Sequence, residues 1–297
     1  MTALAIGRDR VVVSAILELL KPITWFAPMW AFGCGVVSSG VPFGPRWSVA
    51  IIGMVLAGPL MCGASQVIND WFDRDVDRIN QPGRPIPSGR VPGLWGLRIA
   101  ASWMVLALAV AYALGPWVWV TALLGMLLAW IYSAPPLRLK GNGWVGNLAV
   151  GVSYEGLPWF AGAAVTAGSL PDGRVIALAL LYSLGTHGIM TLNDFKSIEG
   201  DRVSGVGSLP ARLGADRACR LACIVMTLPQ LLVAGLLLHW RLPLYAALTM
   251  GLIAAQLALM PRLLRDPRRE APRYNATGTS FYVLGMLLAA FALRAAT

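Results

Sequence analysis

The sequence predicts an all-helical, multi-pass membrane protein that forms a single domain over residues 1–297. Hydrophobic residues make up 57% of the chain and charged residues 13%, and the mean hydropathy is +0.65. A soluble domain carries about 25% charged residues, so this chain has too little polar surface to cover itself in water. Its apolar residues gather in long runs, each near the roughly 20 residues that a helix needs to span a bilayer core.

Nine such runs are expected to form membrane-spanning helices. They cover about residues 23–41, 48–69, 97–114, 116–134, 144–165, 174–193, 219–238, 243–260 and 278–295. Gly115 and Pro116 separate the third run from the fourth, which would otherwise read as one span. The segment before the first run lacks the apolar core and cleavage site of a signal peptide.

The basic residues predict how these helices are oriented. Of the 24 Lys and Arg residues, 20 lie in the N-terminal segment, which includes Arg8 and Arg10, and in the loops after the second, fourth, sixth and eighth runs. The other side receives Arg46, Arg174, Arg241 and Arg294. Because Lys and Arg are retained in the cytoplasm, the N-terminus is expected there and the C-terminus outside. The net charge of +10 then reflects topology and contact with anionic lipid, and not nucleic-acid binding.

Half of the 14 acidic residues lie in two nine-residue segments, 69–77 and 193–201, which directly follow the second and sixth runs. If the second helix continues past Asn69, then Asp70, Asp73 and Asp77 share one helical face, and Asp75 points elsewhere. Three carboxylates on one face repel each other unless a cation lies between them. Mg²⁺ is suited to such a site because it binds one or two carboxylates together with substrate phosphate oxygens. The competing interpretation is a solvated acidic loop.

The second segment offers Asp194 and Asp201, again seven residues apart, with Glu199 as a further contact. Together the two segments predict a site for two Mg²⁺ ions that bridge a diphosphate, with Mn²⁺ as a substitute. Asn69 and Asn193 precede the two segments and are expected to contact substrate.

Cationic side chains near these acids are candidates for binding a diphosphate, since Arg can bind phosphate in a bidentate manner. The candidates are Arg78, Arg84, Arg90, Lys140, Lys196 and Arg202. Each of them also has a simpler interpretation as a charge that sets topology. Lys140 stands out because the preceding Pro135 and Pro136 restrict the loop that carries it.

The pattern Asn-Asp-x-x-Asp-x-x-x-Asp at 69–77, followed by a second acidic motif after a later helix, resembles the UbiA superfamily of intramembrane prenyltransferases. The segments 21–26, 80–90 and 193–202 look like the chlorophyll synthase branch of that superfamily, and Tyr154-Glu155-Gly156-Leu157-Pro158-Trp159-Phe160 looks like the bacteriochlorophyll synthases. Many relatives carry a third Asp where this chain has Ser197, which weakens the assignment of Asp194, Glu199 and Asp201 as metal ligands.

The resemblance implies nine helices around a central cavity capped by the two acidic loops, in a bacterial inner or intracytoplasmic photosynthetic membrane. It also implies a Mg²⁺-dependent esterification of bacteriochlorophyllide a with geranylgeranyl or phytyl diphosphate. The alternatives are chlorophyllide or a quinone precursor as acceptor. The sequence identifies no pigment-protein assembly partner or biosynthetic partner.

Two polar residues within the spans are further candidates for substrate contact. Glu155 is the single acidic residue expected at mid-bilayer, where an ionisable group is costly and indicates function by default. It is expected to hydrogen-bond the acceptor, unless it makes a helix–helix hydrogen bond. His187 lies seven residues before Asp194 and so shares its helical face. It is expected to face the pigment, unless it packs between helices.

Two classes other than an enzyme fit the sequence less well. A cation-coupled transporter would place its acidic residues near the bilayer midplane on broken helices, whereas these acids are expected at the cytoplasmic ends. A passive pigment-binding protein has no use for two acidic clusters. The acids at the cytoplasmic ends therefore favour an enzyme that draws on cytoplasmic metal and diphosphate.

Overall fold

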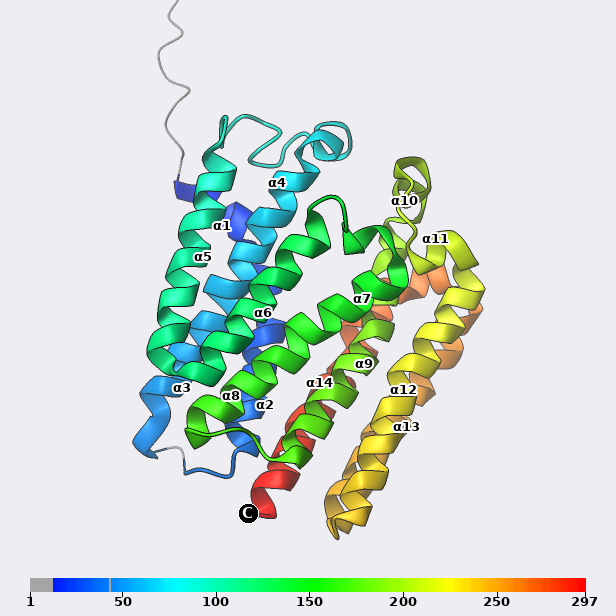
Figure 1. The fold of residues 1–297 in the computed structure, drawn as a ribbon. Helices are drawn as coiled ribbons and strands as arrows, with labels where there is room; N and C mark the ends of the chain where they lie inside the picture. Colours follow the sequence, from blue (N-terminus) through cyan, green and yellow to red (C-terminus); the bar gives the residue numbers. More distant parts are fainter. Residues whose placement is uncertain (1–12, 43) are drawn as a thin grey trace, which may run out of the picture.

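The structure, a computed structural model, describes residues 13–42 and 44–297 and confirms the all-helical class (Figure 1). Within the described residues the β-structure is limited to an isolated bridge between Asn142 and Gly207. Arg8 and Arg10, which were counted with the cytoplasmic charges, lie outside the described residues.

The α-helices account for most of the chain. They are α1 (Val13–Leu20), α2 (Phe26–Ser38), α3 (Trp47–Val55), α4 (Gly63–Asn80), α5 (Trp95–Leu114), α6 (Pro116–Ser133), α7 (Gly143–Gly151), α8 (Leu157–Ala167), α9 (Gly173–Asn193), α10 (Ile198–Ser204), α11 (Leu209–Leu213), α12 (Ala215–His239), α13 (Pro243–Arg265) and α14 (Pro267–Ala295). Two π-helices, η3 (Leu56–Cys62) and η5 (Val152–Gly156), join α3 to α4 and α7 to α8. Short 3₁₀ turns include η1 (Pro22–Thr24) and η6 (Asp194–Lys196).

Within the described residues, seven helical segments are long and apolar enough to cross a membrane. They are Trp47–Asn80, Trp95–Leu114, Pro116–Ser133, Gly173–Lys196, Ala215–His239, Pro243–Arg265 and Pro267–Ala295. The first predicted run forms the shorter apolar helix α2. The fifth run forms α7, η5 and α8, and its polar residues include Asn147, Ser153 and Glu155. The multi-pass class is therefore confirmed, while the count of nine spans stays a prediction.

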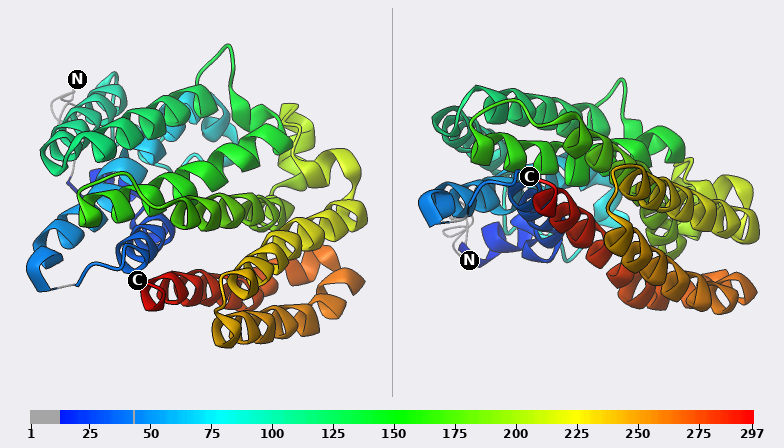
Figure 2. Two further views of the ribbon diagram at one scale, coloured as in Figure 1. Left: turned by 60° about the horizontal axis from the view of Figure 1, so that its bottom comes forward. Right: turned by 90° about the horizontal axis from the view of Figure 1, so that it is seen from below.

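The long helices run roughly side by side, and the loops that follow α4 and α9 lie at the same end of the bundle (Figures 1 and 2). The C-terminus lies at the opposite end. Helix α2 packs closely against α8, and α9 packs against α12. A Cβ atom added at Gly35 or Gly162 would collide with the backbone of the facing helix, so these glycines allow the close approach of α2 and α8. This packing leaves a hollow among α2, α4, α6 and α7.

Candidate active site

Two adjoining cavities open inside the bundle. The first has a volume of about 750 Å³ and is lined largely by apolar side chains of α2, η3, α6 and α8, with Lys21, Arg84 and Lys196 among its polar lining. The second, of about 380 Å³, is lined by acids and bases from α4, from the segment before α7 and from the segment after α9. Asn69, Tyr132 and Lys196 line both. An apolar chamber therefore adjoins a charged one.

The first acidic segment lies on α4, which continues to Asn80 as the spacing of its carboxylates predicts. Asp73 and Asp77 line the charged cavity. Asp70 lines neither cavity and is 2% exposed. Asp75 is 65% exposed and pairs with Arg78 at 3.0 Å, so it points away from the other three as expected.

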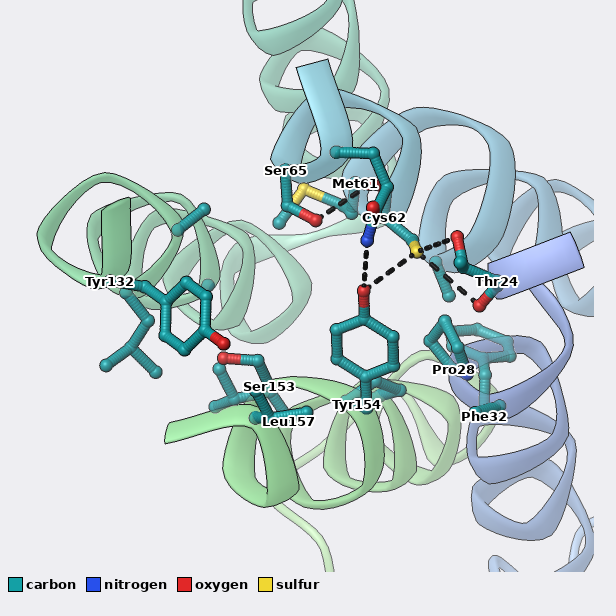
Figure 3. A pocket seen from close by; sticks show the side chains of 18 of the residues that line it. Thr24, Pro28, Phe32, Met61, Cys62, Ser65, Tyr132, Ser153, Tyr154 and Leu157 are labelled. Carbon is teal, nitrogen blue, oxygen red and sulfur yellow. Dashed lines mark hydrogen bonds between the residues drawn. The ribbon is translucent and has the colours of Figure 1, made fainter. Parts of the chain in front are cut away.

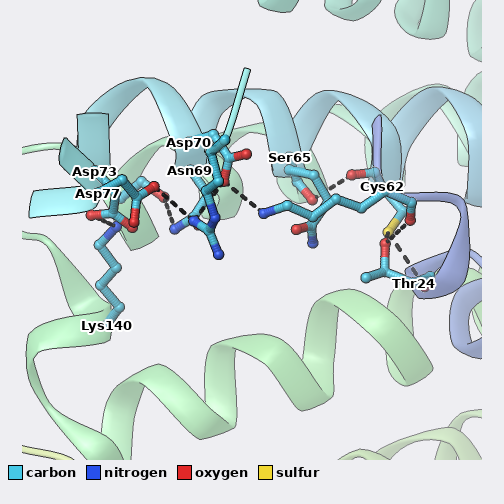
Figure 4. Close-up of polar contacts among 12 residues, drawn as sticks. Thr24, Cys62, Ser65, Asn69, Asp70, Asp73, Asp77 and Lys140 are labelled. Carbon is cyan, nitrogen blue, oxygen red and sulfur yellow. Dashed lines mark hydrogen bonds and ion pairs between the residues drawn. The ribbon is translucent and has the colours of Figure 1, made fainter. Parts of the chain in front are cut away.

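Cations from other parts of the chain meet each of these three carboxylates (Figure 4). Lys21 Nζ lies 2.6 Å from Asp70 Oδ1. Arg84 lies 3.3 Å from Asp70 and 2.7 Å from Asp77. Lys140 Nζ lies 2.6 Å from Asp73 Oδ1. These pairs offset the repulsion that three carboxylates on one face would otherwise feel.

Lys140 is the most enclosed of these cations. Its side chain is 11% exposed, and burial lowers its pKa, which the neighbouring charge of Asp73 partly restores. An ammonium group at this position is held by one carboxylate and turned toward a cavity. Such a group can bind an anion that enters the cavity.

The donor atoms of the charged cavity fit a hard divalent cation. The carboxylates of Asp73, Asp77, Asp194 and Asp201 line it, and carboxylate oxygens are the ligands that Mg²⁺ prefers. Beside it, Asp70 Oδ2 is buried without a hydrogen-bond partner, which is costly for a polar atom unless a further group binds it. Within the described residues, no three His, Cys, Asp or Glu side chains are gathered tightly enough to form a metal site. The residues that line the cavity therefore fit the metal in the chemistry of their donor atoms, and Asp73 and Asp77 among them are paired to Lys140 and Arg84.

The second acidic segment is less regular than the continuous helix that its spacing suggested. Helix α9 ends at Asn193, the turn η6 follows, and α10 begins only at Ile198. Asp194 and Asp201 nevertheless line the same cavity. Asp194 accepts a hydrogen bond from Asn147 Nδ2 at 3.2 Å, and Ser197 Oγ lies 3.0 Å from Asp201 Oδ2.

Glu199 is placed differently from the other predicted metal ligands. Its side chain is 69% exposed and pairs with Arg202 at 3.5 Å and with Arg268 at 3.4 Å. It lines neither cavity. The break after Asp194 directs this part of α10 toward solvent, so the placement gives no support for Glu199 as a ligand.

The predicted substrate-binding residues at the charged end divide into two groups. Those that line a cavity are Asn69, Arg84, Lys140, Asn193 and Lys196. Those that do not are Arg78, Arg90 and Arg202, whose side chains are 67%, 40% and 47% exposed. Each of these three pairs with a nearby carboxylate, Arg90 with Glu18 at 2.6 Å. These placements favour the simpler interpretation of Arg78, Arg90 and Arg202 as surface charges.

The two mid-membrane candidates do not line the cavities either. Glu155 is 6% exposed, and its Oε2 atom has no hydrogen-bond partner. It lies in η5, which packs against α2 and α9. The His187 ring packs against Trp144, with 5.7 Å between ring centroids, which favours the packing interpretation for this residue.

Sequence reasoning missed several residues of the site. Lys21, which binds Asp70, was noted as part of a motif and not as a site residue. Asn147 was missed as well, although a polar residue in an apolar run is the same signal that drew attention to Glu155. The polar side chains around Tyr154 in the wall of the apolar cavity carried no signal of their own, because their meeting depends on tertiary structure (Figure 3).

Comparison with known proteins identifies the family of the chain. Residues 24–286 match the UbiA prenyltransferase family. The chain is 55% identical over 280 residues to the bacteriochlorophyll synthase 33 kDa chain of Cereibacter sphaeroides, covering 94% of this chain and 93% of that protein. It is 43% identical over 290 residues to the chloroplastic chlorophyll synthase of Arabidopsis thaliana, covering 93% and 73%. A solved UbiA homolog from Archaeoglobus fulgidus bound to GPP and Mg²⁺ has the same fold, with a TM-score of 0.72, 20% identity, and 92% and 99% of the two chains covered.

Proposed function

This chain belongs to the UbiA prenyltransferase family, and we propose that it transfers a geranylgeranyl or phytyl group from its diphosphate to the propionate carboxylate of bacteriochlorophyllide a. The observation that carries the proposal is the junction of an apolar cavity of about 750 Å³ with a cavity lined by carboxylates and cations. The high identity to bacteriochlorophyll synthase supports the choice of acceptor.

The charged cavity would bind the diphosphate. Lys140 and Lys196 line it, and Lys21 and Arg84 line the adjoining end of the apolar cavity. When the allylic C–O bond breaks, negative charge develops on the leaving diphosphate, and these cations stabilise it. They act more strongly here than in water because the cavity walls exclude solvent.

Mg²⁺ would be held by Asp73, Asp77, Asp194 and Asp201, together with Asp70, whose Oδ2 atom lacks a partner. When bound, it would supply Lewis-acid neutralisation of the diphosphate. We propose two ions, one for each acidic segment, with Mn²⁺ able to replace them. The homologue from Archaeoglobus fulgidus was solved with Mg²⁺.

The apolar cavity would hold the prenyl chain and exclude water, which would otherwise quench the allylic cation. A propionate oxygen then forms the new C–O bond as the bond to diphosphate breaks, giving an ester and free diphosphate. The acceptor carboxylate is already ionised at neutral pH, so no general base is required.

The test is to incubate the purified protein with Mg²⁺ and geranylgeranyl diphosphate, offering bacteriochlorophyllide a, chlorophyllide a and a quinone precursor in separate reactions. We expect esterified bacteriochlorophyllide, and no product after Mg²⁺ is removed with EDTA. Product with the quinone precursor alone would overturn the proposed acceptor. Parallel reactions with phytyl diphosphate measure the preference for the donor.

We further propose that the loops after α4 and α9 face the cytoplasm, as the charge bias predicts. The test places single cysteines at Arg84 and at Asp172, which precedes α9, in a cysteine-free background. An impermeant thiol reagent added to spheroplasts should label the cysteine at 172 and leave the one at 84 unmodified. The opposite pattern, or equal labelling, would overturn the orientation.

A further inference from the structure

A compact group of polar side chains lies in the wall of the apolar cavity (Figure 3). Gln66 Nε2 donates to the Tyr154 hydroxyl oxygen at 2.8 Å, and Cys62 Sγ donates to the same oxygen at 3.4 Å. Thr24 Oγ1 lies 3.3 Å from Cys62 Sγ. All four residues line the cavity. None of them has a role in the diphosphate chemistry described above.

The backbone around this group is irregular on both sides. Cys62 ends the π-helix η3, and Tyr154 lies in the π-helix η5. Such segments occur frequently at functional sites. Tyr154 lines the cavity, whereas Glu155, the next residue, is buried and does not line it. The chain therefore presents a phenol to the cavity at this point and keeps the adjacent carboxyl group out of it.

The depth of the group follows from the positions of Cys62 at the end of η3 and of Gln66 on α4. Cys62, Ser65 and Asn69 follow one another along these continuous helical segments toward Asp73 (Figure 4). Gln66 precedes Asp70 by four residues and Cys62 precedes it by eight, which corresponds to about 6 and 12 Å along the helix axis. Gln66 and Cys62 therefore lie one to two helical turns from Asp70, in the wall of the apolar cavity.

The chemistry of the two substrates restricts which of them can accept hydrogen bonds from this group. A prenyl chain carries no hydrogen-bonding atoms, so it gains nothing from a phenol or an amide. The acceptor macrocycle carries polar groups on its rim. Because the Tyr154 oxygen already accepts a bond from the Gln66 amide, its own O–H proton is the donor that the group can present to a bound molecule, and the accepted bond strengthens it.

We propose that Tyr154, oriented by Gln66 and Cys62, selects the acceptor by donating a hydrogen bond to a carbonyl on the rim of the macrocycle far from the reacting propionate. The inference rests on the proposed function and names its specificity determinant. Bacteriochlorophyllide a carries an acetyl carbonyl on its rim where chlorophyllide a carries a vinyl group. The acetyl group can accept the bond from Tyr154, and the vinyl group cannot.

The deciding experiment measures kcat/KM for wild type and Tyr154→Phe with two acceptors that differ in one substituent, chlorophyllide a and its acetyl analogue of the same ring saturation. Geranylgeranyl diphosphate is the donor throughout. We expect Tyr154→Phe to lower kcat/KM for the acetyl acceptor by about 5- to 100-fold, since a buried hydrogen bond is lost. The value for the vinyl acceptor and the KM for the diphosphate should change less than about twofold.

Two further variants separate selection from structure. Gln66→Leu removes the amide that orients the phenol, and it should shift the acceptor ratio in the same direction by a smaller factor. If Tyr154→Phe does not insert into the membrane, the acceptor ratio of Gln66→Leu tests the inference in its place. Tyr282→Phe is the matched control, because its buried hydroxyl donates to the Tyr182 carbonyl at 2.5 Å outside the cavity. It should leave the acceptor ratio at the wild-type value.

An equal loss with both acceptors in Tyr154→Phe, or a wild type with no preference for the acetyl acceptor, would overturn the inference and leave the proposed function standing. A wild type that esterifies neither acceptor would overturn the proposed function, and the inference with it.

Discussion

The two acidic regions line one cavity but are built differently. On α4 the carboxylates sit on one continuous helical face, and each pairs with Lys21, Arg84 or Lys140 from another part of the chain. After α9 the acids are divided between a 3₁₀ turn and a short helix. Asp194 accepts a hydrogen bond from Asn147, and Asp201 accepts one from Ser197. In the first region, carboxylates on a continuous helix are paired with cations, and in the second region the backbone bends between the acids.

The difference matters for how a metal–diphosphate complex would enter. In the first region, carboxylates and cations hold each other in place, so both are positioned before substrate arrives. Such preorganisation lowers the reorganisation that binding requires. In the second region, an amide and a hydroxyl hydrogen-bond to Asp194 and Asp201, and the backbone bends between the two acids. We therefore expect the first region to contribute more to turnover than the second.

The largest effect is expected at the centre of the first region. Asp73→Asn removes a carboxylate that lines the charged cavity and holds Lys140, so turnover in saturating Mg²⁺ should fall by roughly 100-fold or more. Asp75→Asn on the same helix is the matched control, because Asp75 is exposed, and it should stay within about twofold of wild type. An Asp73→Asn protein that is inserted and keeps more than about a tenth of the activity would contradict a metal-holding role.

A smaller loss of activity is expected for substitutions in the second region. The loss should differ between Glu199 and Asp201, which are two residues apart. Asp201→Asn should lower kcat/KM by about 10- to 100-fold, because Asp201 lines the cavity. Glu199→Gln should have less than about a twofold effect, because Glu199 lies in solvent beside Arg202 and Arg268. Equal losses in the two variants, measured at several Mg²⁺ concentrations, would mean that α10 turns inward when substrate binds.

Helical periodicity explains why the first region could be predicted and the second only in part. The spacing of Asp70, Asp73 and Asp77 placed them on one face because α4 is a regular helix through Asn80. The same reasoning could not place Glu199, since the chain bends after Asp194 and a new helix begins at Ile198. No pattern within the sequence marks that bend.

Tertiary contacts and π-helices account for the other differences between prediction and structure. Lys21 meets Asp70 across 49 residues, and no local signal predicts such a pair. Glu155 was expected to contact the acceptor, but the register within η5 directs Tyr154 into the cavity instead. Composition and long apolar runs were sufficient for the fold class, because burial in lipid depends on the total apolar length of each helix.

The smallest effect is expected for the ion pair that positions the loop containing Arg84, which contacts the first region. Arg90 in that loop makes two bonds to the Glu18 carboxylate of α1, at 2.6 and 2.9 Å, and a third to the Gly83 carbonyl. Glu18→Gln should raise the KM for the diphosphate by about two- to threefold, because Arg84 becomes less firmly placed. It should lower the Tm by no more than a few degrees at neutral pH.

The sign of the pH dependence follows from the Glu18 pKa, which the hydrogen bond from Arg90 lowers. A carboxyl group with a lowered pKa in the folded state contributes stability that is fully present above its unfolded pKa and is lost as the pH falls through its folded pKa. The Tm difference between wild type and Glu18→Gln should therefore be constant near neutral pH and vanish on acidification below the ordinary Glu pKa of 4.5. Glu270→Gln, which breaks the exposed pair with Arg273 on α14, is the control for the kinetic effect and should leave the KM unchanged. A KM shift of the same size in both variants would show that the Glu18 pair acts on global stability and does not position Arg84.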